Sequence, residues 1–296
     1  MRDRGYRRCK AAWTVLGLLL TLGLATDRSW SAEALIEIDR VLELREGDLL
    51  VTLSLGSLGG RRLYVIRAEL PRDARFEISP AERPQSLAGL VSPGPHVALN
   101  GGFYDEQGHA MGLVVENGVT IHPLRRRGGS GVLIHGAAGF RVVHRTRVPD
   151  RGVERAVQSI DRIVDQGRSL IGAGASPARD ARSAVATFAD GRARLYAVFA
   201  ERAVARKRCH TSGCSFALSA ASTSTGVTLG ELADLLVAEG ASAALNLDGG
   251  YSTSFDASLG GRSLRVAAFR ATTAALIARP REEASGGQPS GAASGR

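Results

Sequence analysis

The apolar residues of this chain occur in short runs, and glycine or charged residues separate each run from the next. Short runs that end at turn residues are typical of β-strands. The 10 prolines and the turn-rich spacing also exclude an all-helical bundle. Such runs lie at residues 35–38, 49–53, 63–66, 97–99, 112–115, 119–121 and 131–134. We therefore expect a β-rich chain.

Two hairpins and one helix are indicated. Asn117-Gly118 is a strong two-residue turn signal, and the runs 183–188 and 193–199 flank a second turn. A helix is predicted to begin at Thr228, where Glu231 completes a capping box, and to end before Gly240. The expected fold class is α+β, with twisted, mixed, largely antiparallel sheets and a few helices in a single domain.

Composition excludes some classes of protein. The chain has 38 Lys+Arg against 29 Asp+Glu, a balance of +9, and 44% hydrophobic residues, which excludes an intrinsically disordered chain. The positive charge is almost all arginine and is scattered along the chain. Because only 5% of residues are aromatic and no basic stripe is present, we expect no nucleic-acid partner.

The first residues have the layout of a secretory signal peptide. Basic residues at 2–10 precede an apolar run at 11–25 and then small residues, so we assign 1–34 to a signal and expect a bacterial periplasmic or secreted protein. An uncleaved anchor is the alternative; no later span is expected. Residues 35–280 form the predicted domain, and 281–296 a disordered tail.

Two cysteines remain in the exported chain. Cys209 and Cys214 are separated by four residues, which favours a local disulfide. A zinc site is the alternative, but only His210 lies nearby.

One strand is predicted to place two polar side chains on the same face. Between residues 244 and 253, Leu245 and Leu247 alternate with Asn246 and Asp248, and two glycines follow. Glycines at a strand end let a ligand approach the backbone and expose its amide groups. The alternative is a tight turn with no binding role.

A second strand ends in the same way, at Asn100-Gly101-Gly102. A third segment places Arg182 at the start of an apolar strand, where a guanidinium group can bind a phosphate or carboxylate. A solvated arginine is the alternative for that residue taken alone.

Other site types are less well supported. The glycines at 172–174 lack the rest of a dinucleotide-binding motif, and the histidines show no metal-ligand spacing. No nucleophile elbow surrounds Ser252 or Thr253, so we expect both to hydrogen-bond to Asp248. No cofactor is predicted; a divalent ion at Asp248 has no support from ligand spacing.

Four segments together resemble the phosphodiester glycosidase family in order and spacing, across about residues 60–280. They are residues 100–104 with Gly112-Leu113 following, Gln158-Ser159, 182–185 and 244–253. The resemblance implies that Asn100, Arg182 and Asp248 line one pocket and that the activity is hydrolysis of a sugar 1-phosphodiester. The chain departs from the family at Ile160-Asp161, where glycine-proline is common, and at Tyr251, where glycine is usual.

The chemistry is consistent with a single carboxylate. Ordinary glycosidases need two, because an alkoxide leaving group must be protonated. A phosphate monoester, with a second pKa of about 6, leaves without that help. We expect Asp248 to act as base, nucleophile or charge stabiliser, Arg182 and the loop amides to bind phosphate, and Asn100 and Asn246 to bind sugar hydroxyls. The candidate catalytic residues are Asp248, Asn100 and Arg182, and the candidate substrate-binding residues are Gly101, Gly102, Asn246, Gly249, Gly250, Ser252 and Thr253.

The leading interpretation is an exported hydrolase that acts on glycosyl phosphodiesters of envelope polymers or exopolysaccharide. One alternative is a carbohydrate-binding or polysaccharide-assembly protein without turnover. Another is a glycosidase of ordinary glycosidic bonds, whose second acid would be Asp105 or Glu106.

Overall fold

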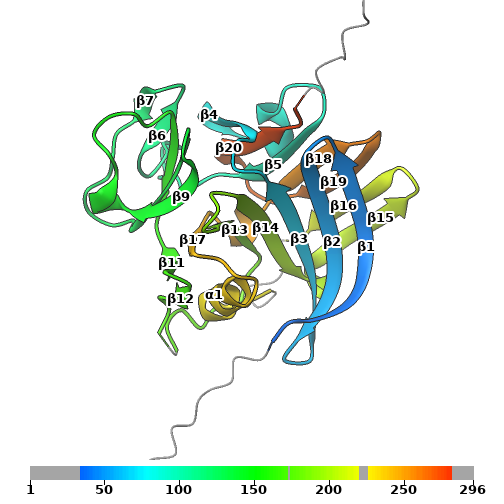
Figure 1. Cartoon of the computed structure of the whole chain (residues 1–296). Coiled ribbons are helices and arrows are strands. Elements are labelled where there is room, and N and C mark those ends of the chain that lie inside the picture. Colours follow the sequence, from blue (N-terminus) through cyan, green and yellow to red (C-terminus); the bar gives the residue numbers. More distant parts are fainter. Residues whose placement is uncertain (1–33, 173, 220–225, 282–296) are drawn as a thin grey trace, which may run out of the picture. The chain divides into compact units, whose positions relative to one another are not determined.

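The computed structural model of the chain describes residues 34–172, 174–219 and 226–281, and all of them belong to one compact unit. Strands dominate this part of the chain (Figure 1). The predicted signal peptide and the predicted tail lie almost wholly outside the described residues. Within the described residues, no helix is long and apolar enough to cross a membrane.

The largest sheet has eight strands, and every neighbouring pair in it is antiparallel. Their order across the sheet is β1 (Ile36–Glu46), β2 (Leu49–Leu58), β3 (Arg61–Leu70), β14 (Ala193–Ala200), β13 (Arg182–Thr187), β17 (Ala243–Asn246), β11 (Arg162–Asp165) and β12 (Arg168–Ser169).

Two further sheets complete the strand system. The five-stranded sheet has the order β7 (Val119–His122), β6 (Val114–Glu116), β10 (Arg155–Ser159), β8 (Gly131–Gly136) and β9 (Gly139–His144). The seven-stranded sheet has the order β15 (Val204–His210), β16 (Gly213–Leu218), β19 (Arg262–Ala267), β18 (Phe255–Leu259), β5 (His96–Asn100), β20 (Thr272–Arg279) and β4 (Arg75–Gln85). The β16–β19 pair is parallel. The predicted mixed, largely antiparallel arrangement is confirmed.

Helical structure is sparser than predicted. Among the described residues, α1 (Leu229–Ala238) is the single α-helix, and the other helical segments are short 3₁₀ helices. Thr228 and Glu231 form the predicted capping box, and Gly240, with φ of +84°, follows the end of the helix. The short 3₁₀ segments are η1 (Leu87–Leu90), η2 (Arg145–Arg147), η3 (Glu201–Ala203) and η4 (Gly250–Ser252).

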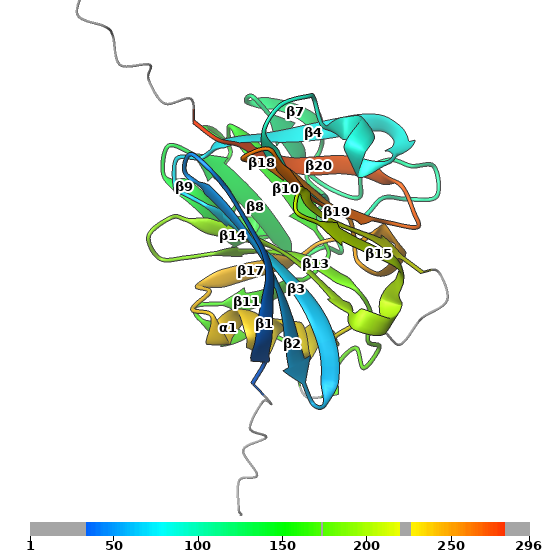
Figure 2. The ribbon, with the colours of Figure 1, turned by 90° about the vertical axis from the view of Figure 1, so that its right-hand side faces the viewer.

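The central strands of the eight-stranded sheet are buried on both faces. α1 packs on one face with Leu232 and Leu236. It lies beside β11 and β17 (Figure 2) and beside β12 (Figure 1). The other face shares a core with side chains from the other two sheets. In β3, Val65 belongs to the first core and Ile66 to the second, as the two-residue period of a strand requires. Burial on both faces explains why the sequences of these strands contain continuous apolar runs rather than a strict alternation of apolar and polar residues.

Two local predictions are confirmed. Asn117 and Gly118 both have positive φ, of 51° and 75°, as a tight hairpin turn between β6 and β7 requires. Cys209 and Cys214 are directly opposite each other in the β15–β16 hairpin and form a disulfide.

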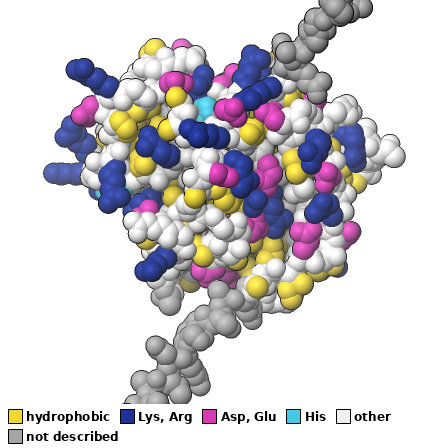
Figure 3. All heavy atoms as spheres, viewed as in Figure 1, with side chains coloured by type: hydrophobic (Ala, Val, Ile, Leu, Met, Phe, Trp, Pro, Cys, Tyr) yellow, Lys and Arg dark blue, Asp and Glu magenta, His cyan; other side chains and the backbone are white. Residues whose placement is uncertain are grey.

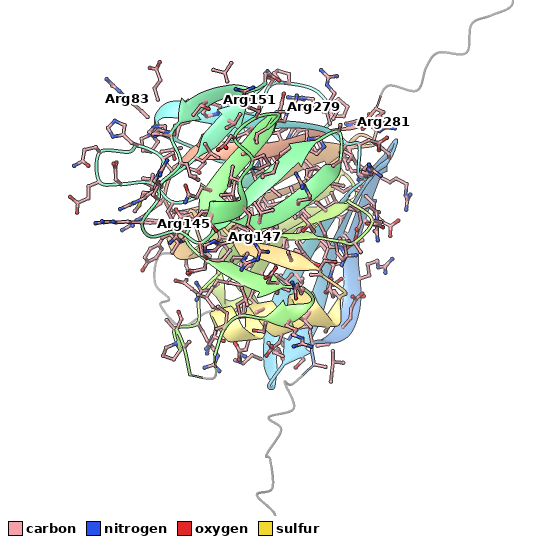
Figure 4. All side chains as sticks on the ribbon, turned by 60° about the vertical axis from the view of Figure 1, so that its left-hand side comes forward. Arg83, Arg145, Arg147, Arg151, Arg279 and Arg281 are labelled. Atoms are coloured by element: carbon pink, nitrogen blue, oxygen red, sulfur yellow. A yellow bond between two sulfur atoms is a disulfide. The ribbon has the colours of Figure 1, made fainter. Side chains whose placement is uncertain are left out.

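The surface charge is mixed. Lys and Arg side chains are interspersed with acidic side chains on the face shown in Figure 3. The arginines labelled in Figure 4 are spread over another side of the molecule, with Arg145 and Arg147 close together in η2.

Candidate active site

The two strands that end in paired glycines meet. β5 belongs to the seven-stranded sheet and β17 to the eight-stranded sheet. The backbone N–H of Asp248 donates to the carbonyl of Gly101 at 3.2 Å, and the side chain of Asn100 donates to the carbonyl of Asp248 at 2.7 Å. The structure therefore brings together the ends of the two strands, which carry Asn100 and Asp248.

Asn100 is fully buried, and its amide is occupied by its own chain. Its Oδ1 accepts a hydrogen bond from Ser183 Oγ at 2.7 Å and one from the Ser254 N–H at 3.0 Å. Its Nδ2 donates to the carbonyls of Asp248 and Gly101. These contacts do not fit the expected role of Asn100 as a ligand of sugar hydroxyls. They give it a positioning role, because it holds the backbone of Asp248.

Two more strand ends fix the same loop. The Gly250 N–H donates to the Ala181 carbonyl at 2.7 Å, and the Leu247 N–H donates to the Ser183 carbonyl at 2.8 Å. On the other side, the Asn246 N–H donates to the Asp161 carbonyl at 2.9 Å. Residues just before or within β13 and just after β10 thus hold the strand end that carries Asp248.

The glycines of both motifs allow close packing between these segments. A Cβ atom at Gly102 would lie 2.6 Å from the Gln158 carbonyl oxygen, and one at Gly249 would lie 2.9 Å from the Ala181 carbonyl oxygen. Gly101 donates its N–H to Ala274, so this amide and that of Gly250 are not free for a phosphate. The expectation that the loop amides bind phosphate therefore does not hold at these two positions.

Asp248 is a half-buried carboxyl group with a cation nearby. Burial raises its pKa to about 6. Hydrogen bonds from the Ser252 side chain and the Gly249 N–H, together with the charge of Arg270, act in the opposite direction. At neutral pH the carboxylate is therefore ionised but close to its titration range, which suits proton transfer.

Arg182 begins β13 as predicted, and two of its nitrogens are fixed by the backbone. Nε donates to the Val227 carbonyl at 3.1 Å, and Nη2 donates to the Ala178 carbonyl at 2.8 Å. Burial lowers its pKa, while the charges of Asp180 and Asp161 raise it. Within the described part of the chain no hydrogen bond from Nη1 is present, so this group is free for an anion.

Sequence reasoning missed the second carboxylate of the site, Asp180. A Cβ atom at Gly250, which has φ of +59°, would lie 2.7 Å from Asp180 Oδ2. Burial raises the pKa of Asp180, and its charge raises the pKa of Asp248. The only sequence signal is its place two residues before Arg182.

Asp105 does not have the environment of a catalytic acid. Its Oδ1 accepts the N–H groups of Gln107 and His109, and these bonds keep its pKa below the usual range. A general acid needs a raised pKa, so Asp180 replaces Asp105 as the candidate second acid. Glu106 is exposed.

The remaining predicted binding residues differ in their contacts. Ser252 hydrogen-bonds to Asp248 as expected. The expected hydrogen bond from Thr253 to Asp248 is not formed, because Thr253 is fully buried and its Oγ1 has no partner among the described residues. The same holds for Oδ1 of buried Asn246, which is therefore an acceptor available to a hydroxyl or a buried water.

A further loop, residues 268–271 between β19 and β20, was not predicted to belong to the site. The Arg270 N–H donates to the Tyr251 carbonyl at 2.8 Å, next to the Asp248 motif. The Tyr104 hydroxyl, from the segment after Gly101-Gly102, donates to the Ala271 carbonyl at 3.0 Å. No motif in the sequence pointed to this loop.

The described residues contain no metal centre. Among residues 34–172, 174–219 and 226–281, no group of three or more His, Cys, Asp or Glu side chains is placed to hold a metal ion.

The family model for phosphodiester glycosidases matches residues 93–282, and this range contains every segment assembled above. The chain belongs to the phosphodiester glycosidase family. This membership indicates a hydrolase of the glycosidase type. A search of curated proteins gave no match.

One solved structure shares the fold at low sequence identity, and two others are less similar. The catalytic domain of zebrafish N-acetylglucosamine-1-phosphodiester alpha-N-acetylglucosaminidase, auto-inhibited by its pro-peptide, is 15% identical over 84% of this chain and 89% of its own, with a TM-score of 0.58. A hypothetical protein from Synechocystis is 17% identical over 78% and 62%, with a TM-score of 0.48. A protein of Burkholderia pseudomallei described as exported is 12% identical over 75% of both chains, with a TM-score of 0.45.

Proposed function

We propose that this protein is an exported hydrolase that cleaves the bond between an anomeric carbon and phosphate in glycosyl 1-phosphodiesters of envelope polymers or exopolysaccharide. The observation that carries the proposal is the junction of β5 and β17. There Asp248 has a pKa of about 6, and the cations Arg182 and Arg270 lie close to its loop, with charges that suit a phosphate. Family membership supports the reaction class.

The reaction is hydrolysis at the anomeric carbon. The oxygen of water forms a bond to the anomeric carbon, and the bond between that carbon and the phosphate oxygen breaks. The electron pair of the broken bond leaves with the phosphate monoester. Asp248 takes the proton of the attacking water, or attacks the carbon itself before water releases the sugar. Arg182 Nη1 neutralises the charge that develops on the departing phosphate. Asn100 holds the backbone of Asp248 in place during these steps.

The test is hydrolysis of UDP-N-acetylglucosamine and of methyl N-acetylglucosamine 1-phosphate by residues 35–296, with and without chelator. We expect release of free sugar by the wild type and none by Asp248→Asn. Loss of activity with chelator would add a metal to the mechanism. Normal turnover by a folded Asp248→Asn protein would rule out the assigned role of Asp248.

A second candidate function has its own observation. Asp180 lies at the Asp248 loop with a raised pKa, so the site holds the two carboxyl groups that hydrolysis of an ordinary glycoside needs. Asp180→Asn separates the two functions. It should abolish turnover of an alkyl glycoside, and it should leave substantial turnover of a phosphodiester, whose leaving group needs no acid.

A third candidate function is binding without turnover, and it predicts a different outcome for the wild type and Asp248→Asn. The sugar phosphodiester would bind to the wild type and to Asp248→Asn, and no free sugar would appear with either protein.

A further inference from the structure

Five arginines from two segments of the chain form what we call the arginine patch. They are Arg125, Arg126 and Arg127, in the loop between β7 and β8, and Arg145 and Arg147, in η2. Arg145 is half-buried, and the other four are exposed. Figure 4 shows Arg145 and Arg147 close together. Asp and Glu are absent from residues 117–149, so both segments bring positive charge without acidic neighbours along the chain.

The charge of the patch is not neutralised by the protein. Within the part of the chain that the structure describes, none of its five arginines makes an ion pair. Arginines elsewhere differ, as Arg162 shows by its pairing with Asp165 at 2.8 Å. Burial lowers the pKa of His144, and the charges of Arg145 and Arg147 lower it further. Like charges gathered in this way attract an anionic partner.

Hydrogen bonds fix the backbone that carries the patch. Gln158 Oε1 accepts the Arg125 N–H at 2.9 Å, and Gln158 Nε2 donates to the Arg125 carbonyl at 2.9 Å. Arg145 Nε donates to the Arg126 carbonyl at 2.9 Å, and its Nη1 donates to the Gly129 carbonyl at 3.0 Å. The loop is therefore held in place while its three guanidinium groups face solvent, which lowers the entropic cost of binding a ligand.

Gln158 joins the patch to the candidate active site. Its side chain holds Arg125, and its carbonyl oxygen lies 2.6 Å from where a Cβ atom of Gly102 would be. Just after the loop, the Ser130 N–H donates to the Ile160 carbonyl at 2.6 Å. A long substrate that leaves the site past the first glycine motif therefore meets the patch.

A groove continues the patch on the five-stranded sheet. Its volume is about 490 Å³, and its lining includes Arg126 and Arg151 over the buried side chains of Leu113 and Val115. Asp150 is the one acidic residue in that lining. Ligand sites commonly have volumes of about 300–1,000 Å³ and combine apolar walls with a few polar groups, so the groove suits a sugar ring that carries a phosphate.

Two other polyanionic partners fit this surface less well. Binding of single-stranded nucleic acid relies on exposed aromatic rings, but Phe140, the one Phe, Tyr or Trp in residues 117–151, is buried. A membrane surface needs exposed apolar side chains on the cationic face. The exposed hydrophobic residues of β7, Val119 and Ile121, share one face of the strand, and Ile121 lines a separate cavity with Val114.

We infer that the arginine patch and its groove bind the phosphates of an anionic polymer whose sugars are joined by phosphodiester bonds. Guanidinium groups bind phosphate oxygens through two parallel hydrogen bonds, which suits arginine to this partner. The diester to be cleaved lies at Asp248, and neighbouring repeats of the polymer lie along the patch. The inference rests on the proposed function and names the class of its substrate.

The first experiment compares a tetramer of N-acetylglucosamine 1-phosphate units, joined by phosphodiester bonds, with methyl N-acetylglucosamine 1-phosphate. We expect the triple variant Arg125→Gln/Arg126→Gln/Arg127→Gln to lower the ratio of kcat/KM for tetramer over methyl diester by about tenfold, because an exposed ion pair contributes up to about fivefold. Turnover of the methyl diester should be unchanged. The matched control is Arg83→Gln/Arg206→Gln/Arg208→Gln, at exposed arginines on the edge strands of the seven-stranded sheet.

A binding experiment does not depend on turnover. The tetramer is titrated calorimetrically into Asp248→Asn protein with and without the triple substitution in the patch, after circular dichroism shows that both proteins are folded. We expect the substitution to weaken binding by about tenfold, and the affinity of the Asp248→Asn protein to fall as salt is raised. Patch-dependent binding with neither diester cleaved would remove the proposed function and keep the patch as the binding surface for the polymer.

Two results would overturn the inference. One is an unchanged substrate ratio in the triple variant together with equal binding of the tetramer by both proteins; cleavage of the methyl diester would then leave the proposed function standing. The other is tighter, patch-dependent binding of oligogalacturonate or oligothymidylate of the same charge, or of phosphatidylglycerol vesicles, than of the tetramer. That result would assign the patch to a polyuronate, a nucleic acid or a membrane.

Discussion

The side chain of Asn100 donates a 2.7 Å hydrogen bond to the backbone carbonyl of Asp248, 148 residues further along the chain. Asn100 ends a strand of one sheet, and Asp248 follows a strand of another. The bond therefore joins two sheets at the point where the candidate catalytic carboxylate leaves the backbone. Five expected outcomes depend on this junction.

Activity should fall at acid pH. Because Asp248 must be ionised to act and its pKa is raised to about 6, kcat/KM should be flat above pH 7 and drop about tenfold per pH unit below pH 6. A pH–rate profile on methyl N-acetylglucosamine 1-phosphate measures this. Full activity at pH 4 would contradict the role of an ionised Asp248.

Asp248→Asn should make the protein more stable at neutral pH. Burial raises the folded-state pKa above the ordinary value of 3.8, so wild type loses stability as the pH rises from about 4 to about 6. Two pKa units correspond to at most about 3 kcal/mol, so we expect a gain on the order of 2 kcal/mol at pH 8 and almost none at pH 3.5. Urea unfolding of wild type and Asp248→Asn at both pH values measures the gain in the free energy of unfolding. An equal gain at pH 8 and pH 3.5 would contradict a raised pKa of Asp248.

Asp180→Asn should shift the acid limb of the pH–rate profile to lower pH. The variant removes a negative charge that raises the pKa of Asp248. Asp105→Asn is the matched control, because Asp105 hydrogen-bonds within its own loop and should leave the limb in place. An unmoved limb in Asp180→Asn would mean that the two carboxyl groups do not interact.

Asn100→Ala should lower both the stability of the fold and the activity. It leaves the buried Ser254 N–H and Ser183 hydroxyl without their acceptor, and the Asp248 carbonyl without its donor. An unsatisfied buried group costs about 1–3 kcal/mol, so we expect a loss of about 3 kcal/mol in the free energy of unfolding. Gln107→Ala, at an exposed amide, should change it by less than about 0.5 kcal/mol.

Gly102→Ala should disturb the junction of β5 and β17 by a steric clash, without removing any polar group. Its Cβ atom would lie 2.6 Å from the Gln158 carbonyl oxygen, closer than real Cβ contacts, so the β5 end or the β10 end must move. Overpacking of this kind costs about 1–3 kcal/mol, and we expect kcat to fall with it. At Gly172 an added Cβ meets no atom within 4 Å, so Gly172→Ala is the control that should be neutral.

Several features were determined by the sequence itself, because they depend on neighbouring residues. The two-residue period of the strands, the Asn117-Gly118 turn and the capping box of Thr228 with Glu231 are local, and the structure has all three. The Cys209–Cys214 pair is also local, since both residues lie in one hairpin. The family motifs, which are short and contiguous, likewise pointed to Asp248, Asn100 and Arg182 as members of one site.

Only the tertiary structure decided what these residues touch. It showed that Asn100 is occupied by its own chain, that Asp180 lies at Gly250, and that Arg270 joins the site from another loop. Such contacts depend on how three sheets pack, and a spacing along the chain does not encode them. The pKa of Asp248 also depends on the tertiary structure, because burial and the charges of distant segments set it.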